Sequence, residues 1–272
     1  VSYAFVEPVA FPEFLQAHGQ EKLLQRLRDW TPGHLLGEAA QAQAMEFYDR
    51  YLMTGGMPEV VAADIAGALA SECRRLQRDL LQTYRNDFAK YSGRMDRRIL
   101  DDVLRGAVDQ LGCKFIYSHV GGEVKHQQAR RALELLCMAQ LCDAIPHAAC
   151  HGVPLAGNIN ERLQKVALLD VGLAHGIWNT PAGHSFPRWS DLAPALRGGL
   201  CEQGIAQQLR IAMGEPTRRG QLFHWRRENG RAGEIDLVLE CGGMIVPVET
   251  KSGASGSMTG RLAGDQAKLM DS

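Results

Sequence analysis

Hydrophobic residues recur every three or four positions over much of the first 140 residues, which predicts amphipathic helices. From about Gln20 to Tyr91 the pattern predicts a series of helices that breaks at Gly55-Gly56 and restarts after Pro58. Paired glycines allow a tight turn between packed helices. From Asp96 to Leu155 the order is helix, short connector, two helices and a polar hairpin. This order suggests a winged helix with residues 143–157 as the wing.

The hydrophobic pattern changes near the C-terminal end, in the stretch GEIDLVLECGGMIVPVETKSG at residues 233–253. Two short runs of aliphatic and β-branched residues flank a Gly-Gly pair, which predicts a hairpin. Its strands are expected at Ile235–Leu239 and Met244–Val248, with the turn at Cys241–Gly243.

This hairpin carries the candidate chemistry, an Asp on one strand and the pattern E-x-K after the next. Side chains alternate along a strand, so Glu249 and Lys251 should share a face while Thr250 points the other way. Hairpin pairing can bring Asp236 beside them. Two carboxylates a few ångströms apart can hold Mg²⁺ or Mn²⁺, and a lysine can position water or support developing charge. The alternative is that all three are ordinary exposed charges on a hairpin.

A helix precedes the hairpin in the segment GGLCEQGIAQQLRIAMG, with Leu200, Ile205 and Leu209 at helical spacing and Glu202 near its start. A helix with Glu, a strand with Asp and a strand with E-x-K resemble the PD-(D/E)xK, or restriction-endonuclease-like, family. The resemblance implies that Asp236, Glu249 and Lys251 are catalytic, and that Glu202 joins Asp236 and Glu249 as a metal ligand. Gln266 falls where some members carry a helix glutamine.

A second resemblance runs over nearly all the chain. The stretch KVALLDVGLAHGIW, Lys165–Trp178, predicts strand, turn and helix and is similar to a "K.y..D.GL" element of AAA-type ATPases that carry a C-terminal domain of unknown function. The later elements of that family, "G...E..v..eL", "EvDfvl" and "piEvK", also follow here in order. The matching residues are Lys165, Asp170, Gly172, Leu173, Gly199, Glu202, Leu209, Trp225, Glu234, Asp236, Pro247, Glu249 and Lys251.

The opening segment and YLMTGGMPEVV extend this resemblance, and imply that the chain follows an ATPase domain. Neither a G-x-x-x-x-G-K-[ST] loop nor a Walker B run is present, so ATP would bind only in that N-terminal domain. The chain also stops short of the family's usual end. We therefore expect a multi-domain α and α/β protein with a mixed sheet in its nuclease-like part. The expected domains are 1–20, the tail of the ATPase domain; 21–95, helical; 96–157, winged-helix-like; and 158–272, PD-(D/E)xK nuclease-like and truncated.

Composition and charge narrow the function classes only slightly. The 272 residues are 45% hydrophobic and 22% charged, which is ordinary for a globular protein of two or three domains. No run of eighteen apolar residues and no signal peptide occurs, so we expect a cytoplasmic protein without a membrane partner. Seven scattered cysteines favour reduced thiols, and their spacing does not favour a zinc site.

The formal net charge of −1 gives no support for nucleic-acid binding, so any such binding must use a local patch. Arginines interleaved with aromatic residues can follow a nucleic-acid backbone and stack on bases, but they can equally guard an edge strand. The predicted recognition helix can contact phosphates, although winged helices also mediate protein contacts. The candidate nucleic-acid-binding residues are Arg218, Arg219, Arg226, Arg227, Lys125, Arg130 and Arg131.

Two functional hypotheses follow. In the first, the C-terminal domain is a metal-dependent nuclease tethered to an ATPase that acts on nucleic acid. In the second, it is a non-catalytic DNA- or protein-interaction module, because a fold by itself establishes no activity. Both leave a homo-oligomer open.

Overall fold

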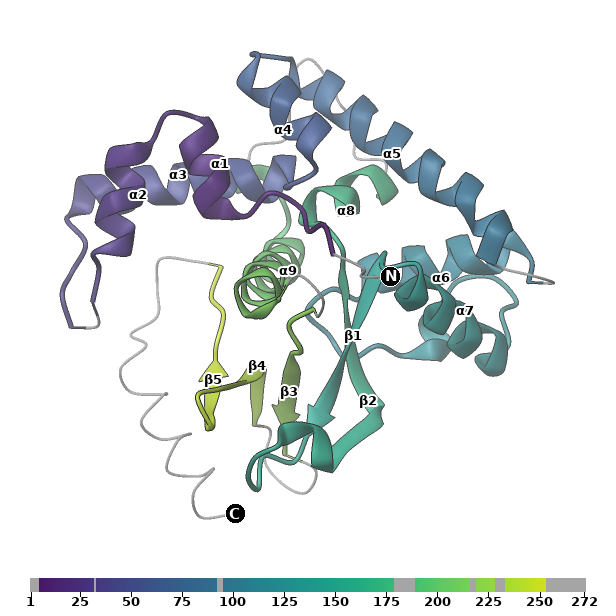
Figure 1. The fold of residues 1–272 in the computed structure, drawn as a ribbon. Helices are drawn as coiled ribbons and strands as arrows, with labels where there is room; N and C mark the ends of the chain where they lie inside the picture. Colours follow the sequence, from purple (N-terminus) through teal and green to yellow (C-terminus); the bar gives the residue numbers. More distant parts are fainter. Residues whose placement is uncertain are drawn as a thin grey trace.

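The computed structural model describes residues 5–31, 33–91, 95–178, 189–215, 219–227 and 233–252. Within these ranges the chain is a mixed α/β protein with nine α-helices and a five-stranded sheet (Figure 1). The helices are α1 Phe11–Ala17, α2 Glu21–Arg28, α3 Glu38–Thr54, α4 Pro58–Ile65, α5 Ala70–Tyr91, α6 Arg97–Asp109, α7 His126–Met138, α8 Val171–Ile177 and α9 Pro194–Met213. The strands are β1 Cys142–Ala148, β2 Ile159–Leu168, β3 Phe223–Arg226, β4 Glu234–Cys241 and β5 Met244–Val248.

The five strands form one sheet in the order β2-β1-β3-β4-β5. Neighbouring strands are antiparallel except for β1 and β3, which pair in parallel at His147 and His224. Strands on the two sides of the predicted domain boundary at residue 157 therefore share hydrogen bonds in a single sheet. The boundary itself remains a prediction.

The predicted C-terminal hairpin is confirmed. Strands β4 and β5 pair in antiparallel register from Leu237 opposite Val248 to Cys241 opposite Met244. Gly242 and Gly243 make the turn with φ of 59° and 75°. These backbone angles lie in the left-handed region that glycine adopts without steric cost, so the Gly-Gly pair was a reliable local signal.

The segment predicted as a wing, residues 143–157, contains most of strand β1 and the connection that leads to β2, which pairs with β1 in antiparallel register. Helix α7 ends at Met138, and Gln140 follows with φ of 61°, which no continuing helix allows. Strand β1 starts at Cys142 and lies between β2 and β3 with most of its residues buried. The first part of the expected wing, residues 143–148, is thus an interior strand, and the winged-helix assignment remains a prediction.

Helix α9 connects the helical part of the molecule with the sheet. Figure 1 shows it between helices α1–α3 and strands β3–β5. One side packs through Ala206 against Leu237 and Leu239 of β4, while Leu200 and Cys201 join the large core formed by the helices. The position of α9 therefore determines where its polar side chains meet the sheet.

Candidate active site

A buried lysine gathers three carboxylates between β2, α9 and β4. The Nζ of Lys165 on β2 lies 2.9 Å from Oε1 of Glu202 on α9 and 2.9 Å from Oε1 of Glu234 on β4. It also lies 3.8 Å from Oδ1 of Asp236, two residues further along β4. The side chain of Lys165 is 2% exposed. We call these four residues the acid–lysine cluster.

The cluster holds more negative than positive charge. Burial raises the pKa of Glu202 to about 7 against the opposing effect of Lys165, with smaller upward contributions from the carboxylates of Asp236 and Glu234. Burial alone would lower the pKa of Lys165, but Glu202 and Glu234 outweigh it and raise that pKa, which keeps the ammonium charged. Three carboxylates around one ammonium leave an unneutralised negative charge at this site.

Asp236 is oriented by the chain after β5. Its Oδ2 accepts hydrogen bonds from the backbone N of Thr250 at 2.7 Å and from Oγ1 of Thr250 at 2.9 Å. The expectation that the Thr250 side chain points away from Asp236 is therefore wrong. Strand β5 ends at Val248, so the strict alternation of a strand no longer applies at Thr250.

Glu249 and Lys251 form an ion pair with each other. The β4–β5 ladder begins at Leu237 opposite Val248, so Glu249 directly follows the last paired residue of β5. Within the described residues, however, no hydrogen bond or ion pair joins Glu249 or Lys251 to the acid–lysine cluster. The structure thus brings Glu202 and Asp236 together and leaves the E-x-K residues paired beside them.

The donor set of the cluster suits a hard divalent cation, because Mg²⁺ and Mn²⁺ prefer carboxylate oxygens. In the part of the chain that the structure describes, no group of three or more His, Cys, Asp and Glu side chains is arranged as a ready set of metal ligands. Lys165 lies at the point where the acids converge. Sequence reasoning did not assign Glu234 and Lys165 to the site, although Glu234 lies two residues before Asp236 on the same strand and both residues belong to the quoted motifs.

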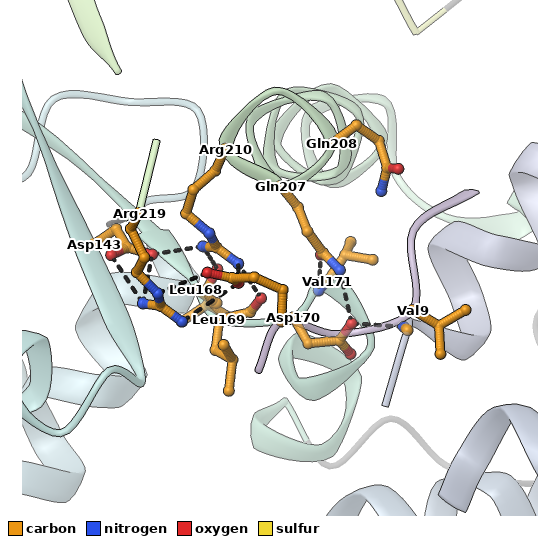
Figure 2. A network of polar contacts seen from close by, with 12 residues as sticks. Val9, Asp143, Leu168, Leu169, Asp170, Val171, Gln207, Gln208, Arg210 and Arg219 are labelled. Atoms are coloured by element: carbon orange, nitrogen blue, oxygen red, sulfur yellow. Dashed lines mark hydrogen bonds and ion pairs between the residues drawn. The ribbon is translucent and has the colours of Figure 1, made fainter. Parts of the chain in front are cut away.

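Several buried polar contacts fix α9 and hence Glu202. The carboxylate of Asp170, which is 0% exposed, accepts hydrogen bonds from the backbone N of Gly56, the backbone N of Gly172 and Nε2 of Gln207. Figure 2 shows Gln207 extending from α9 toward Asp170. The side-chain amide of Gln203 accepts a hydrogen bond from the backbone N of Leu168, at the end of β2, and donates one to the backbone oxygen of the same residue. These contacts hold the helix against the strand that carries Lys165.

Arg219, a predicted nucleic-acid ligand, pairs with two carboxylates, and its side chain is 12% exposed. Its Nε lies 2.7 Å from Glu7 and its Nη1 lies 3.2 Å from Asp143. The buried Arg210 on α9 contacts the same two acids at 3.0 and 2.5 Å. Figure 2 shows the two arginines converging on Asp143. We call these four residues, Glu7, Asp143, Arg210 and Arg219, the ionic network.

The other described candidate nucleic-acid residues lie in two separate groups. Arg226 and Arg227 are exposed at the end of β3. Lys125, Arg130 and Arg131 are exposed on or next to α7, which Figure 1 places beside β1 and β2, away from β5. Arg130 also forms an ion pair with Glu134 at 3.1 Å. Arg218 and Gln266 lie outside the described residues.

The fold and the site define a mixed α/β protein whose buried acid–lysine cluster lies between one long helix and a mixed sheet. The chain belongs to the family described as a domain of unknown function (DUF8612), which matches residues 45–182. Residues 197–261 match a second domain of unknown function (DUF4143), which is often found in AAA-ATPase-associated proteins. Lys165 comes from the first match and the three acids come from the second.

No curated protein and no solved structure matches the chain. Among the described residues, no helix has both the length and the apolar character required to cross a membrane.

Proposed function

We propose that the chain is the C-terminal part of an AAA-type ATP-binding protein, and that α9 and β3–β5 form a nuclease-like domain. This domain binds nucleic-acid phosphodiesters and hydrolyses them with Mg²⁺ or Mn²⁺. The observation that carries the proposal is the surplus of carboxylates around Lys165, next to the E-x-K residues. The order of α9 with Glu202, β4 with Asp236 and β5 followed by Glu249 agrees with the PD-(D/E)xK pattern.

The residues have separate roles in this proposal. Asp236, Glu249 and Glu202 would hold the divalent ion, which when bound stabilises phosphate charge and lowers the pKa of an attacking water. Thr250 holds Oδ2 of Asp236 and leaves Oδ1 directed toward the cluster. Lys251, whose side chain is 41% exposed, is accessible to position water or to support charge on the phosphate.

A second candidate function is a non-catalytic interaction module. It is favoured by the pairing of Glu249 with Lys251 and of the remaining acids with Lys165, because these ion pairs neutralise part of the charge that would attract a metal. The ion pairs of Arg219 with Glu7 and Asp143 also engage one of the expected phosphate ligands.

Incubation of the purified chain with single- and double-stranded DNA and RNA, with and without Mg²⁺ or Mn²⁺, separates the two functions. We expect metal-dependent cleavage that Asp236→Asn and Lys251→Ala each reduce by at least 100-fold, as loss of a ligand or charge-stabilising group does. Glu161→Gln, an exposed carboxylate on β2, is the matched control and should retain activity. Binding without cleavage would favour the interaction module, and absence of both would contradict each proposal that involves nucleic acid.

A further inference from the structure

The site proposed for the metal ion already surrounds one positive charge, the ammonium of Lys165. We propose that Lys165 is an internal competitor of the divalent ion: its ammonium holds the acids together in the metal-free protein, and the ion binds by displacing it from Glu202 and Asp236. This inference rests on the proposed function and adds a regulating residue to its site.

The carboxylate oxygens that face the cluster show why the two cations compete. Oε1 of Glu202 accepts a hydrogen bond of 2.9 Å from Nζ of Lys165. The other oxygen, Oε2, lies against the connector after α6, where a Cβ added to Gly112 would come within 3.1 Å of it. A metal ion approaching from the cluster therefore meets the same Glu202 oxygen that Lys165 uses.

Asp236 on β4, like Glu202, has one side-chain oxygen that faces Lys165. Its Oδ2 accepts both hydrogen bonds from Thr250, so Oδ1 is the oxygen directed toward the cluster. That oxygen lies 3.8 Å from Nζ of Lys165. Of the three proposed ligand residues, Glu202 and Asp236 thus each offer one oxygen to the cluster, and both oxygens are directed at the lysine. The ammonium and a divalent ion cannot occupy this place together, because like charges at such short distance repel strongly.

Glu234 gives the displaced ammonium a partner. Its Oε1 lies 2.9 Å from Nζ, and its side chain is 40% exposed, whereas that of Glu202 is 10% exposed. Lys165 can therefore give up Glu202 and Asp236 and remain paired at the solvent side of the cluster. The ammonium would then lie beside Glu234, the more exposed of the two acids that it contacts at 2.9 Å.

The test is the affinity for Mn²⁺ and Mg²⁺, measured by calorimetry on wild-type protein and on Lys165→Met. Without the ammonium the acids lose their internal cation, so we expect Lys165→Met to bind Mn²⁺ at least tenfold more tightly than wild type. Mn²⁺ should also raise the melting temperature of this variant more than that of wild type. Adding Asp236→Asn to Lys165→Met should abolish the gain, and Lys22→Met, an exposed lysine on α2, should leave the affinity unchanged.

An affinity of Lys165→Met within twofold of wild type, or weaker, would overturn the inference. If Lys165→Met does not fold, the wild-type protein with ¹³C-labelled lysine side chains gives a second measurement. The Lys165 signal, assigned by its absence from Lys165→Arg, should shift during Mg²⁺ titration; a fixed signal at saturating Mg²⁺ would refute displacement.

The outcomes also separate this inference from the proposed function. Tighter metal binding in Lys165→Met without cleavage by either protein supports the competitor and contradicts the nuclease. Cleavage by wild type with unchanged affinity in the variant supports the nuclease and contradicts the competitor. Absence of metal binding in both proteins overturns both.

Discussion

His224 is a buried titratable side chain close to the acid–lysine cluster. It lies on β3 with Nε2 3.0 Å from the carbonyl oxygen of Leu163, while its buried Nδ1 has no hydrogen-bond partner among the described residues. Burial lowers the pKa of His224 to about 4; the Leu163 carbonyl and Glu234 oppose this shift, whereas Lys165 and His147 reinforce it. The ring of His147 lies 5.6 Å away across β1 and β3. The imidazole is therefore neutral in the folded protein at neutral pH.

This environment predicts an acid-sensitive contribution to folding. Because the pKa of His224 is lower in the folded than in the unfolded protein, the unfolded state binds the proton more readily between pH 6.5 and about 4. Stability should fall as the pH drops through this window, by up to about 3 kcal/mol from this residue. His224→Gln can still donate to the Leu163 carbonyl and should lose that part of the pH dependence.

Urea unfolding between pH 4.5 and 7.5 measures this difference. His151→Gln, at an exposed position, is the matched control and should keep the wild-type slope. Equal slopes for His224→Gln and wild type would show that His224 is not the titrating group.

The turn between α3 and α4 allows a direct test of close packing. Gly55 has φ of 79°, and a Cβ there would lie 2.1 Å from Oδ1 of Asp170. Gly67, after α4, has φ of 78° with nothing within 4 Å of its added Cβ. Gly67→Ala should cost about 1 to 2 kcal/mol for the left-handed backbone. Gly55→Ala should cost roughly 2 kcal/mol more, because Asp170 must also move.

Chemical denaturation of both glycine variants provides the comparison. A similar loss in the two would mean that the contact between the α3–α4 turn and Asp170 contributes little. A larger loss in Gly55→Ala would identify this turn as the element that fixes Asp170, which also bonds Gln207 of the site helix.

The sequence predicted the elements whose signal is local. The Gly-Gly turns at Gly55 and Gly242, and the alternation around Asp236, each depend on a few neighbouring residues, and the structure has the turns and the hairpin as expected. The end of α7 and the start of β1 were predicted less well. Cys142 continues a helical periodicity, but the segment pairs with β2 and β3, and β3 is about eighty residues away. Local periodicity carries no information about such pairing.

The candidate site was predicted only in part for the same reason. Asp236 and Glu202 were expected to act together, and they do share Lys165. The role of Lys165 could not be read from the sequence, because 37 positions separate it from Glu202 and only the sheet order brings β2 into position. Likewise, the pairing of Arg219 with Glu7 joins residues more than two hundred positions apart.

The two segments that match family models, residues 45–182 and 197–261, pack together as one unit among the described residues. One hydrophobic core extends from Phe14 through the helices to Cys201, and the sheet joins β1 and β2 to β3–β5. The ionic network adds a polar connection, because Arg210 on α9 contacts Glu7 near the start of the chain and Asp143 on β1. Loss of the ionic network should therefore destabilise both the helical core and the sheet.

This continuity predicts a single cooperative unfolding transition. Far-UV circular dichroism follows the helices, while the combined fluorescence of the four tryptophans, among them Trp178 in the helical core and Trp225 in the sheet region, follows the packing. The two signals should give coincident midpoints in urea. Arg210→Met, which leaves Glu7 and Asp143 with Arg219 alone, should lower both midpoints together and cost about 3 kcal/mol. Two separate transitions, with only one sensitive to Arg210→Met, would instead indicate independent domains divided near residue 157.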